Sequence, residues 1–217
     1  MALRFQLERP AKWATSLVGL TVLGDLALGY QSFATLAFFR TATDGSLTDA
    51  DLMLAGETLD SQALVVSIGY LVAFVLSVIA SGIWIYRASW NAGQLQPSVN
   101  RITPGWAVGW YFVPFMALWK PLQAMKECWN SSADPQGDMD RGMPGLMTGW
   151  WTTWVVTSLW SSFSTRRWNK ADTIEEMRNL CWGDIVMTPV SIASAILFIL
   201  LIQRLTQMQA QHLLSAE

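Results

Sequence analysis

Five apolar segments constrain this chain more than any other feature of its sequence. They cover residues 13–39, 63–86, 106–119, 146–163 and 185–202. A helix needs about 20 mostly apolar residues to cross the hydrocarbon core of a bilayer, and all segments except the third approach or exceed that length. Only 14% of the residues are charged, whereas soluble domains carry about 25%. The sequence therefore predicts an all-α integral membrane protein, a polytopic bundle of about five hydrophobic helices that forms one transmembrane domain over residues 1–217.

The third apolar segment leaves two topologies open. Its residues 106–119 make about 21 Å of helix, which is too short to cross a bilayer unaided, and they include Pro114. If this segment crosses, the chain has five spans and the C-terminus is outside. If it dips into the membrane and returns, the chain has four spans plus a re-entrant segment, and the C-terminus is inside. The distribution of Lys and Arg fits both topologies equally, and the pair Arg166 and Arg167 beside the fourth segment slightly favours five spans.

Charges near the N-terminus predict the orientation of the chain. Arg4, Arg9 and Lys12 precede the first apolar segment, and an acidic loop follows it. Lys and Arg concentrate on the cytoplasmic side of membrane proteins, so we expect a cytoplasmic N-terminus. The first segment is far longer than the apolar part of a secretory signal, which has about 7–15 residues. It therefore reads as a retained span.

An amphipathic pattern follows the third segment. Leu118, Leu122, Met125 and Trp129 recur at helical spacing, polar residues lie between them, and Pro121 suits a first helical turn. This pattern predicts an amphipathic interfacial helix near residues 121–130.

Asp25 is the sharpest candidate for a functional residue because it lies in the middle of the first apolar segment. An ionisable group inside a bilayer is costly and marks a functional site by default. Two interpretations are open: a proton or cation relay, or a protonated carboxyl group that is hydrogen-bonded between helices. Its candidate partners are the hydroxyl groups of Ser67, Ser77, Thr157 and Ser191, and Lys120 if the third segment dips.

The Trp and Arg residues provide further candidate contacts. Most of the 13 Trp residues fall at predicted span ends, where they could form an aromatic belt at the headgroup level or a stacking surface for a flat ligand. The Arg residues could bind anionic lipid headgroups or only determine the topology. The candidate contacts with lipid, ligand or partner are Arg87, Asn91, Trp106, Trp110, Trp119, Lys120, Arg166 and Arg167.

Composition argues against several classes of function. A net charge of −2 excludes a nucleic-acid-binding protein, which needs a strongly basic surface. One His and two Cys provide too few ligands for the common metal and haem sites. The chain contains no phosphate-binding Gly-rich loop and no nucleophile elbow. We therefore expect no catalytic residues, no metal and no cofactor, and we do not expect an enzyme.

The middle of the chain carries a distinctive set of motifs. They are Trp84-Ile-Tyr-Arg87, Asn91-Ala92, Thr103-Pro-Gly-Trp-Ala-Val-Gly-Trp-Tyr-Phe-Val-Pro114, Leu118-Trp-Lys-Pro121 and Lys126-Glu-Cys-Trp129. With these motifs, residues from about 63 to 210 resemble a bacterial membrane family, domain of unknown function 4328. The resemblance implies a multi-pass protein of the bacterial inner membrane and no particular activity.

These observations lead to one main expectation about function and two alternatives. We expect a non-catalytic integral membrane protein, an accessory or scaffold subunit of a larger membrane complex, whose partners are membrane lipids and other membrane subunits. The first alternative is a small transporter or channel that uses Asp25. The second alternative is a membrane protein that binds a lipid or another hydrophobic ligand.

Overall fold

The computed structural model describes residues 5–45, 48–97, 102–137 and 142–214. Arg4 lies outside these ranges. Within them the chain is helical and contains no strand. The elements are α1 (Glu8–Asp44), α2 (Asp49–Leu95), α3 (Pro104–Gly109), the 3-10 turns η1 (Trp110–Phe112) and η2 (Met116–Leu118), α4 (Lys120–Ala133), α5 (Gly145–Trp168) and α6 (Ile174–Leu214).

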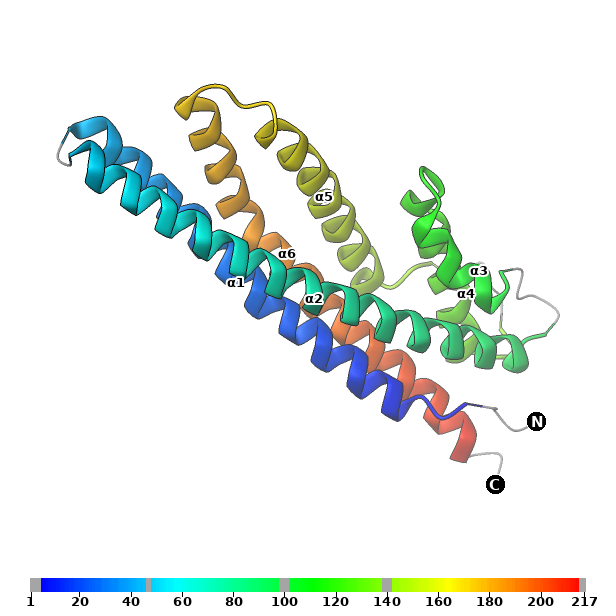
Figure 1. Ribbon diagram of the computed structural model, residues 1–217. Coiled ribbons are helices and arrows are strands. Elements are labelled where there is room, and N and C mark those ends of the chain that lie inside the picture. Colours follow the sequence, from blue (N-terminus) through cyan, green and yellow to red (C-terminus); the bar gives the residue numbers. More distant parts are fainter. Residues whose placement is uncertain (1–4, 46–47, 98–101, 138–141, 215–217) are drawn as a thin grey trace.

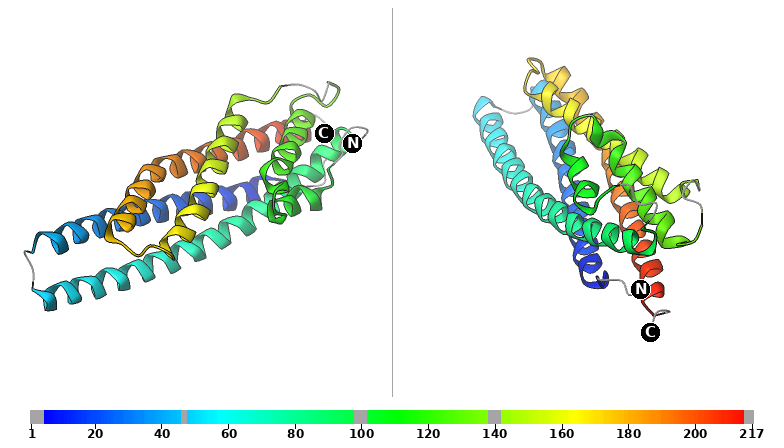
Figure 2. Two further views of the ribbon diagram at one scale, coloured as in Figure 1. Left: turned by 90° about the horizontal axis from the view of Figure 1, so that it is seen from above. Right: turned by 90° about the vertical axis from the view of Figure 1, so that its right-hand side faces the viewer.

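Four long helices form the body of the molecule (Figure 1). Helix α1 packs against α2 and α6, and α5 packs against α6. The first and last described residues lie at the same end, together with the end of α2 and with α3 and α4 (Figures 1 and 2). The turn between α1 and α2 and the turn between α5 and α6 lie toward the opposite end, where the two helix pairs separate. We call the first end the terminal end and the second the turn end.

The predicted acidic loop between the first two apolar segments is largely helical. Helix α1 continues to Asp44 and ends at Gly45, whose φ of 70° suits a residue without a side chain. Helix α2 begins after Thr48, whose hydroxyl oxygen accepts a hydrogen bond from the backbone N–H of Asp51 at 3.3 Å. Both helices therefore extend well beyond the apolar segments 13–39 and 63–86.

Three helices are long and apolar enough to cross a membrane: α1, α2 and α6. Helix α5 is 24 residues long, but it is not among them. The expected count of about five spans is therefore not confirmed.

The third apolar segment is not a spanning helix, because its backbone is broken in several places. Helix α3 has only six residues, and two short 3-10 turns follow it. Between them Val113 is extended and Phe115 has a φ of 63°, and Pro114 has no N–H for a helical hydrogen bond. Of the two topologies left open for residues 106–119, the crossing one is not confirmed, and the segment folds back before α4 (Figure 1).

Helix α4 confirms the predicted amphipathic helix near residues 121–130, with Pro121 in its first turn. One face of the helix packs against α2, α3 and α6. Ala124, Met125 and Cys128 on this face are each at most 5% exposed. Leu122 and Trp129 are only partly buried, so the apolar face of α4 is covered in part by the chain itself.

The hydrophobic core lies toward the terminal end. Trp84 of α2 is fully buried, and its indole N–H donates to Thr206 Oγ1 of α6 at 3.0 Å. Trp150 of α5 stacks on Phe198 of α6 with 4.9 Å between the ring centroids. Trp151 is also buried. An aromatic belt at the membrane surface is therefore wrong for these three Trp residues, because helix packing removes them from the surface.

Candidate functional site

Asp25 lies where α1, α2 and α6 meet. The hydroxyl group of Ser191 in α6 donates to Asp25 Oδ2 at 3.0 Å. Tyr70 of α2 lies beside the same carboxyl group. The carboxyl group thus joins three helices that are distant from one another in the sequence.

Two glycines of α1 allow these helices to approach closely. A Cβ atom on Gly24 would lie 2.6 Å from the Tyr70 ring, and one on Gly29 would lie 2.8 Å from Thr188 Oγ1. Real Cβ atoms do not approach other heavy atoms so closely, so larger residues would push α2 and α6 away. The contact between Asp25 and its partners therefore depends on the small residues beside it.

Of the predicted partners of Asp25, Ser191 has a described hydrogen bond to it. Three others bond elsewhere. Ser77 and Thr157 donate to carbonyl groups of their own helices. Lys120 donates to Gln123 of α4 at 3.0 Å. Tyr70 was missed, although it is a polar-tipped residue inside the second apolar segment, and antiparallel pairing of α1 and α2 places it opposite Asp25.

A second carboxylate, Asp184, joins α5 and α6. The indole N–H of Trp160 donates to Asp184 Oδ1 at 2.7 Å, and the hydroxyl group of Ser164 donates to the same oxygen at 3.0 Å. A Cβ atom on the neighbouring Gly183 would collide with the Trp160 ring. Asp184 lies just outside the fifth apolar segment, so its position in the sequence does not mark it as an interior acid, whereas α6 begins ten residues earlier at Ile174.

Gln209 is the centre of a buried polar network at the terminal end. Its Nε2 atom donates to the backbone oxygen of Ala88 in α2 at 3.0 Å and to Ser132 Oγ in α4 at 2.8 Å. His212 Nε2 lies 2.8 Å from the backbone oxygen of Ser132. These contacts attach the last turns of α6 to α2 and α4, so their described role is structural.

Asn91 and Arg87, two of the predicted contact residues, hold the N-terminal segment. Asn91 is fully buried; its Oδ1 accepts from the backbone N–H of Phe5 at 3.1 Å, and its Nδ2 donates to the Phe5 carbonyl at 2.7 Å. The Arg87 guanidinium lies over the Phe5 ring, 5.5 Å from its centroid. Asn91 is therefore not open to a ligand or partner, because the chain itself occupies its side chain.

The other predicted contact residues lie in two separate places. Trp106 and Trp110 stack with 4.4 Å between centroids, and Trp106 and Trp119 remain about half exposed. These residues and Lys120 belong to the elements at the terminal end. Arg166 and Arg167 lie at the turn end, where Arg167 pairs with Glu176 at 3.2 Å. The structure therefore does not bring the predicted residues together into one site.

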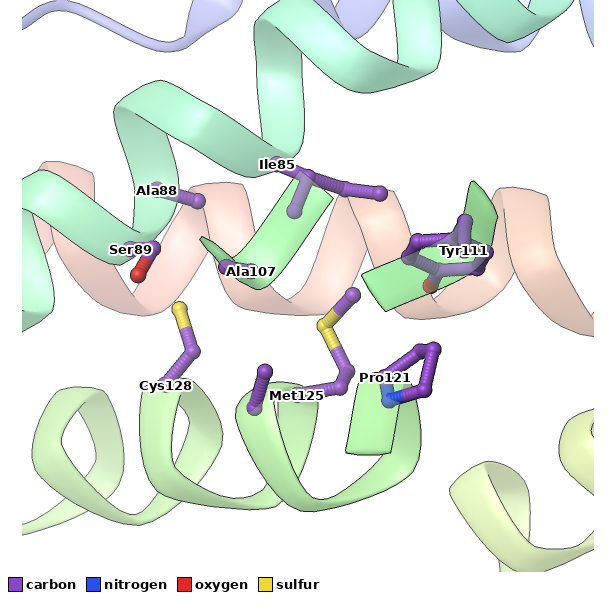
Figure 3. A pocket seen from close by; sticks show the side chains of 9 residues that line it. Ile85, Ala88, Ser89, Ala107, Tyr111, Pro121, Met125 and Cys128 are labelled. Carbon is purple, nitrogen blue, oxygen red and sulfur yellow. The ribbon is translucent and has the colours of Figure 1, made fainter. Parts of the chain in front are cut away.

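A small enclosed cavity lies between α2, α3 and α4 (Figure 3). Its volume is about 10 Å³, which is room for one water molecule at most. Ile85, Tyr111 and Met125 point into it from different elements (Figure 3). A cavity of this size cannot hold an organic ligand.

Cys128 also lines this cavity. Burial raises the pKa of the Cys128 thiol to about 12, because the thiolate would lose its hydration in an apolar setting. A thiol with such a pKa is a poor nucleophile near neutral pH.

The interior polar groups lie between helices. In the described ranges no three His, Cys, Asp or Glu side chains cluster as metal ligands would. The two interior carboxylates each accept hydrogen bonds from hydroxyl or indole donors of neighbouring helices. The polar groups thus link helices to one another, and the remaining surface of α1, α2 and α6 is rich in exposed apolar side chains.

Comparison with known proteins gives one result. No curated protein and no solved structure matches the chain. A family model described as Domain of unknown function (DUF4328) matches residues 49–207, a range that runs from the first residue of α2 into α6 and includes Tyr70, Asp184 and Ser191. This match covers most of the chain, so the protein belongs to the family described as Domain of unknown function (DUF4328).

Proposed function

We propose that this protein is a non-catalytic integral membrane protein that serves as an accessory or scaffold subunit of a larger membrane complex. The observation that carries the proposal is the length and exposure of the α1–α2 pair. Helix α2 has 47 residues, or about 70 Å, whereas the hydrocarbon core is about 30 Å thick. The excess length provides surface outside the lipid on which a partner can dock.

The docking surface that we propose is the α1–α2 arm, defined as residues 34–44 and 49–62. The arm stands apart from α5 and α6 at the turn end (Figures 1 and 2). Five of its residues are acidic and only Arg40 is basic. Met53 and Leu54 are 70% and 65% exposed. Exposed apolar side chains rimmed by charges favour a protein partner, and the acidic excess favours one with a basic surface.

The proposal includes a location and a topology. The basic residues before the first apolar segment support a cytoplasmic N-terminus in the bacterial inner membrane. The first and last described residues lie at one end of the molecule, which supports an even number of crossings. These are α1, α2 and α6, together with α5, which at 24 residues is long enough to cross although it is not among the three most apolar helices. The folded-back segment between α3 and α4 then serves as a re-entrant hairpin, a role supported by the exposed side chains of Phe112 and Phe115.

The transport alternative receives less support from the surroundings of Asp25. Its carboxyl group is packed against Tyr70 and Ser191, and Asp25 lines neither the small cavity beside Cys128 nor a larger one between α5 and α6. A relay needs a path for water or ions on both sides of the acid. If transport were the function, a pH-dependent flux would be lost in Asp25→Asn.

The experiment that tests the scaffold proposal is extraction of native membranes in a mild detergent, followed by size separation. We expect the protein to migrate within an assembly much larger than its own 24.2 kDa. The double variant Met53→Ser, Leu54→Ser and the double variant Glu57→Lys, Asp60→Lys should release it from that assembly. The matched control Gln123→Ser, Lys126→Glu alters the terminal end and should leave the assembly intact. Migration of the wild-type chain alone, near its own mass plus detergent, would overturn the proposal.

A further inference from the structure

A half-open cavity lies between the last turns of α5 and the first turns of α6. Its volume is about 240 Å³, enough for a small polar group and far more than the single water that fits the enclosed cavity. Its walls include Trp160, Phe163 and Arg167 from α5, and Glu176 and Asn179 from α6. The cavity therefore combines aromatic rings with one positive and one negative side chain.

The two charges are held in a defined arrangement. Arg167 Nη2 lies 3.2 Å from Glu176 Oε1, with the two side chains 50% and 41% exposed. Glu176 Oε2 also accepts the backbone N–H of Asp172 at 3.3 Å, which fixes the carboxylate at the cavity wall. A guanidinium has five N–H donors, so Arg167 retains donors for a further anion, such as a phosphate.

The aromatic side of the cavity is oriented as well. The Trp160 indole N–H donates its hydrogen bond to Asp184. A ligand in the cavity can therefore contact the Trp160 ring only through its carbon atoms. The Phe163 ring lies 5.5 Å from it, between centroids. The faces of aromatic rings attract cations, especially ammonium groups. Trp160 and Glu176 together therefore suit a positively charged amine.

The position of the cavity suggests where such a ligand would come from. Trp168 directly follows Arg167 and Trp182 lies two residues after Leu180 of the cavity wall. They are 41% and 54% exposed, as expected for indole rings at the headgroup level of a bilayer. This step rests on the membrane location proposed above, although it does not depend on the scaffold role. A phosphate and an ammonium group occur together at that level in zwitterionic phospholipids.

We propose that this cavity binds the headgroup of an ammonium-bearing zwitterionic phospholipid, with Arg167 and Asn179 on the phosphate and with Glu176 and Trp160 on the ammonium group. An anionic lipid such as phosphatidylglycerol has no ammonium group, and it would place its phosphate near Glu176 without compensation. The same carboxylate thus attracts one headgroup and disfavours the other, which is how a site gains specificity.

The test measures lipid retention by native mass spectrometry of the full chain in detergent after delipidation. Phosphatidylethanolamine and phosphatidylglycerol with identical acyl chains are supplied as an equimolar mixture. We expect the wild-type chain to retain phosphatidylethanolamine about two- to fivefold better, since a partly exposed charge pair contributes a modest free energy. Glu176→Gln should remove this preference, and Arg167→Gln should weaken retention of both lipids.

Neighbouring residues provide matched controls. Glu175→Gln and Arg166→Gln make the same chemical changes one position away, outside the cavity wall, and should leave the preference intact. Because both lipids compete for the same folded protein, a loss of stability in Glu176→Gln would not by itself alter their ratio. Equal retention by the wild-type chain, or an unchanged ratio in Glu176→Gln, would overturn the proposal.

Further outcomes distinguish a membrane lipid from a soluble ligand, and a failure of the lipid-site proposal from a failure of the scaffold proposal. Soluble glycerophosphoethanolamine that displaces the lipid at equal concentration would show a site for a free amine phosphate, and this result would overturn a lipid site. A chain that leaves membranes in alkaline carbonate would overturn the membrane location on which both proposals rest. Migration outside any assembly would overturn only the scaffold role.

Discussion

At the scale of single residues, the interior acids connect helices. Asp25 accepts from Ser191, and Asp184 accepts from Trp160 and Ser164. Each acid therefore contributes to the stability of the fold, because an apolar side chain of similar size would leave the neighbouring donors without an acceptor. The glycines beside them allow the approach that these hydrogen bonds require.

The role of Asp25 can be tested by two substitutions. Asp25→Asn keeps an oxygen that accepts the Ser191 hydroxyl, so we expect a small loss of stability. Asp25→Leu leaves the Ser191 hydroxyl without its acceptor, and we expect a loss of about 0.6–1.7 kcal/mol, the range for side-chain hydrogen bonds between membrane helices. Unfolding of the purified protein in mixed detergent measures both values. Equal destabilisation by Asn and Leu would contradict a hydrogen-bonding role.

The burial of Cys128 predicts an unusual pH profile for its alkylation. The thiolate is the reactive form, and a pKa of about 12 leaves on the order of 0.01% thiolate at pH 8. In a Cys181→Ala background, we expect labelling by iodoacetamide to be slow and to rise about tenfold for each pH unit between 7 and 10. Denatured protein is the control and should label rapidly. A rate that levels off near pH 9 in the folded protein would show an exposed thiol.

At the scale of the elements, α5 is attached to the body mainly through α6. Gly183 faces the Trp160 ring so closely that a Cβ atom has no room. At the other end of α5, Trp151 Nε1 donates to the backbone oxygen of Leu118 at 3.1 Å. The position of α5 thus depends on one close helix contact and on the folded-back segment before α4.

Gly183→Ala should therefore destabilise the protein. The added methyl group forces α5 and α6 apart, and overpacking of this kind costs about 1–3 kcal/mol. Adding Trp160→Phe to Gly183→Ala should restore part of the loss because the smaller ring makes room, although Asp184 then loses one donor. The unfolding midpoint of the single and double variants in detergent is the measurement.

Gly145→Ala is the control for this series. A Cβ atom on Gly145 meets nothing within 4 Å, so this change should leave stability unchanged or improve it slightly through helix propensity. A Gly183→Ala variant that is as stable as Gly145→Ala would contradict the close packing of α5 on α6.

At the scale of the whole molecule, the first and last described residues share one end of the bundle (Figure 1). The Gln209 network and the Asn91 contact with Phe5 hold both described terminal segments against α2 and α4. This arrangement supports the even number of membrane crossings proposed above.

Reporter fusions test this topology. A protein that fluoresces only in the cytoplasm, fused to either chain end, should be fluorescent in both cases. The same reporter inserted at Gly45, the turn between α1 and α2, should remain dark. Fluorescence at the N-terminus alone would indicate an odd number of crossings and would contradict the even number that we propose.

Much of this architecture could be predicted from the sequence, because hydrophobic length and charge are local properties. The apolar segments 13–39, 63–86 and 185–202 lie within α1, α2 and α6, which are the three helices able to span a membrane. The helix near residues 121–130 was predicted from its spacing, and the family from the motifs between Trp84 and Trp129. The same local signals identified Asp25 and included Ser191 among its partners.

Tertiary structure alone decided which residues meet. Tyr70 reaches Asp25, Trp160 reaches Asp184 and Asn91 holds Phe5 across long sequence separations, and composition carries no information about such pairings. The third apolar segment has the hydrophobicity of a span, yet it folds back because Pro114 and the strained backbone at Phe115 interrupt its helix. Hydropathy measures how well a segment tolerates lipid, whereas backbone hydrogen bonding and helix packing determine whether that segment crosses it.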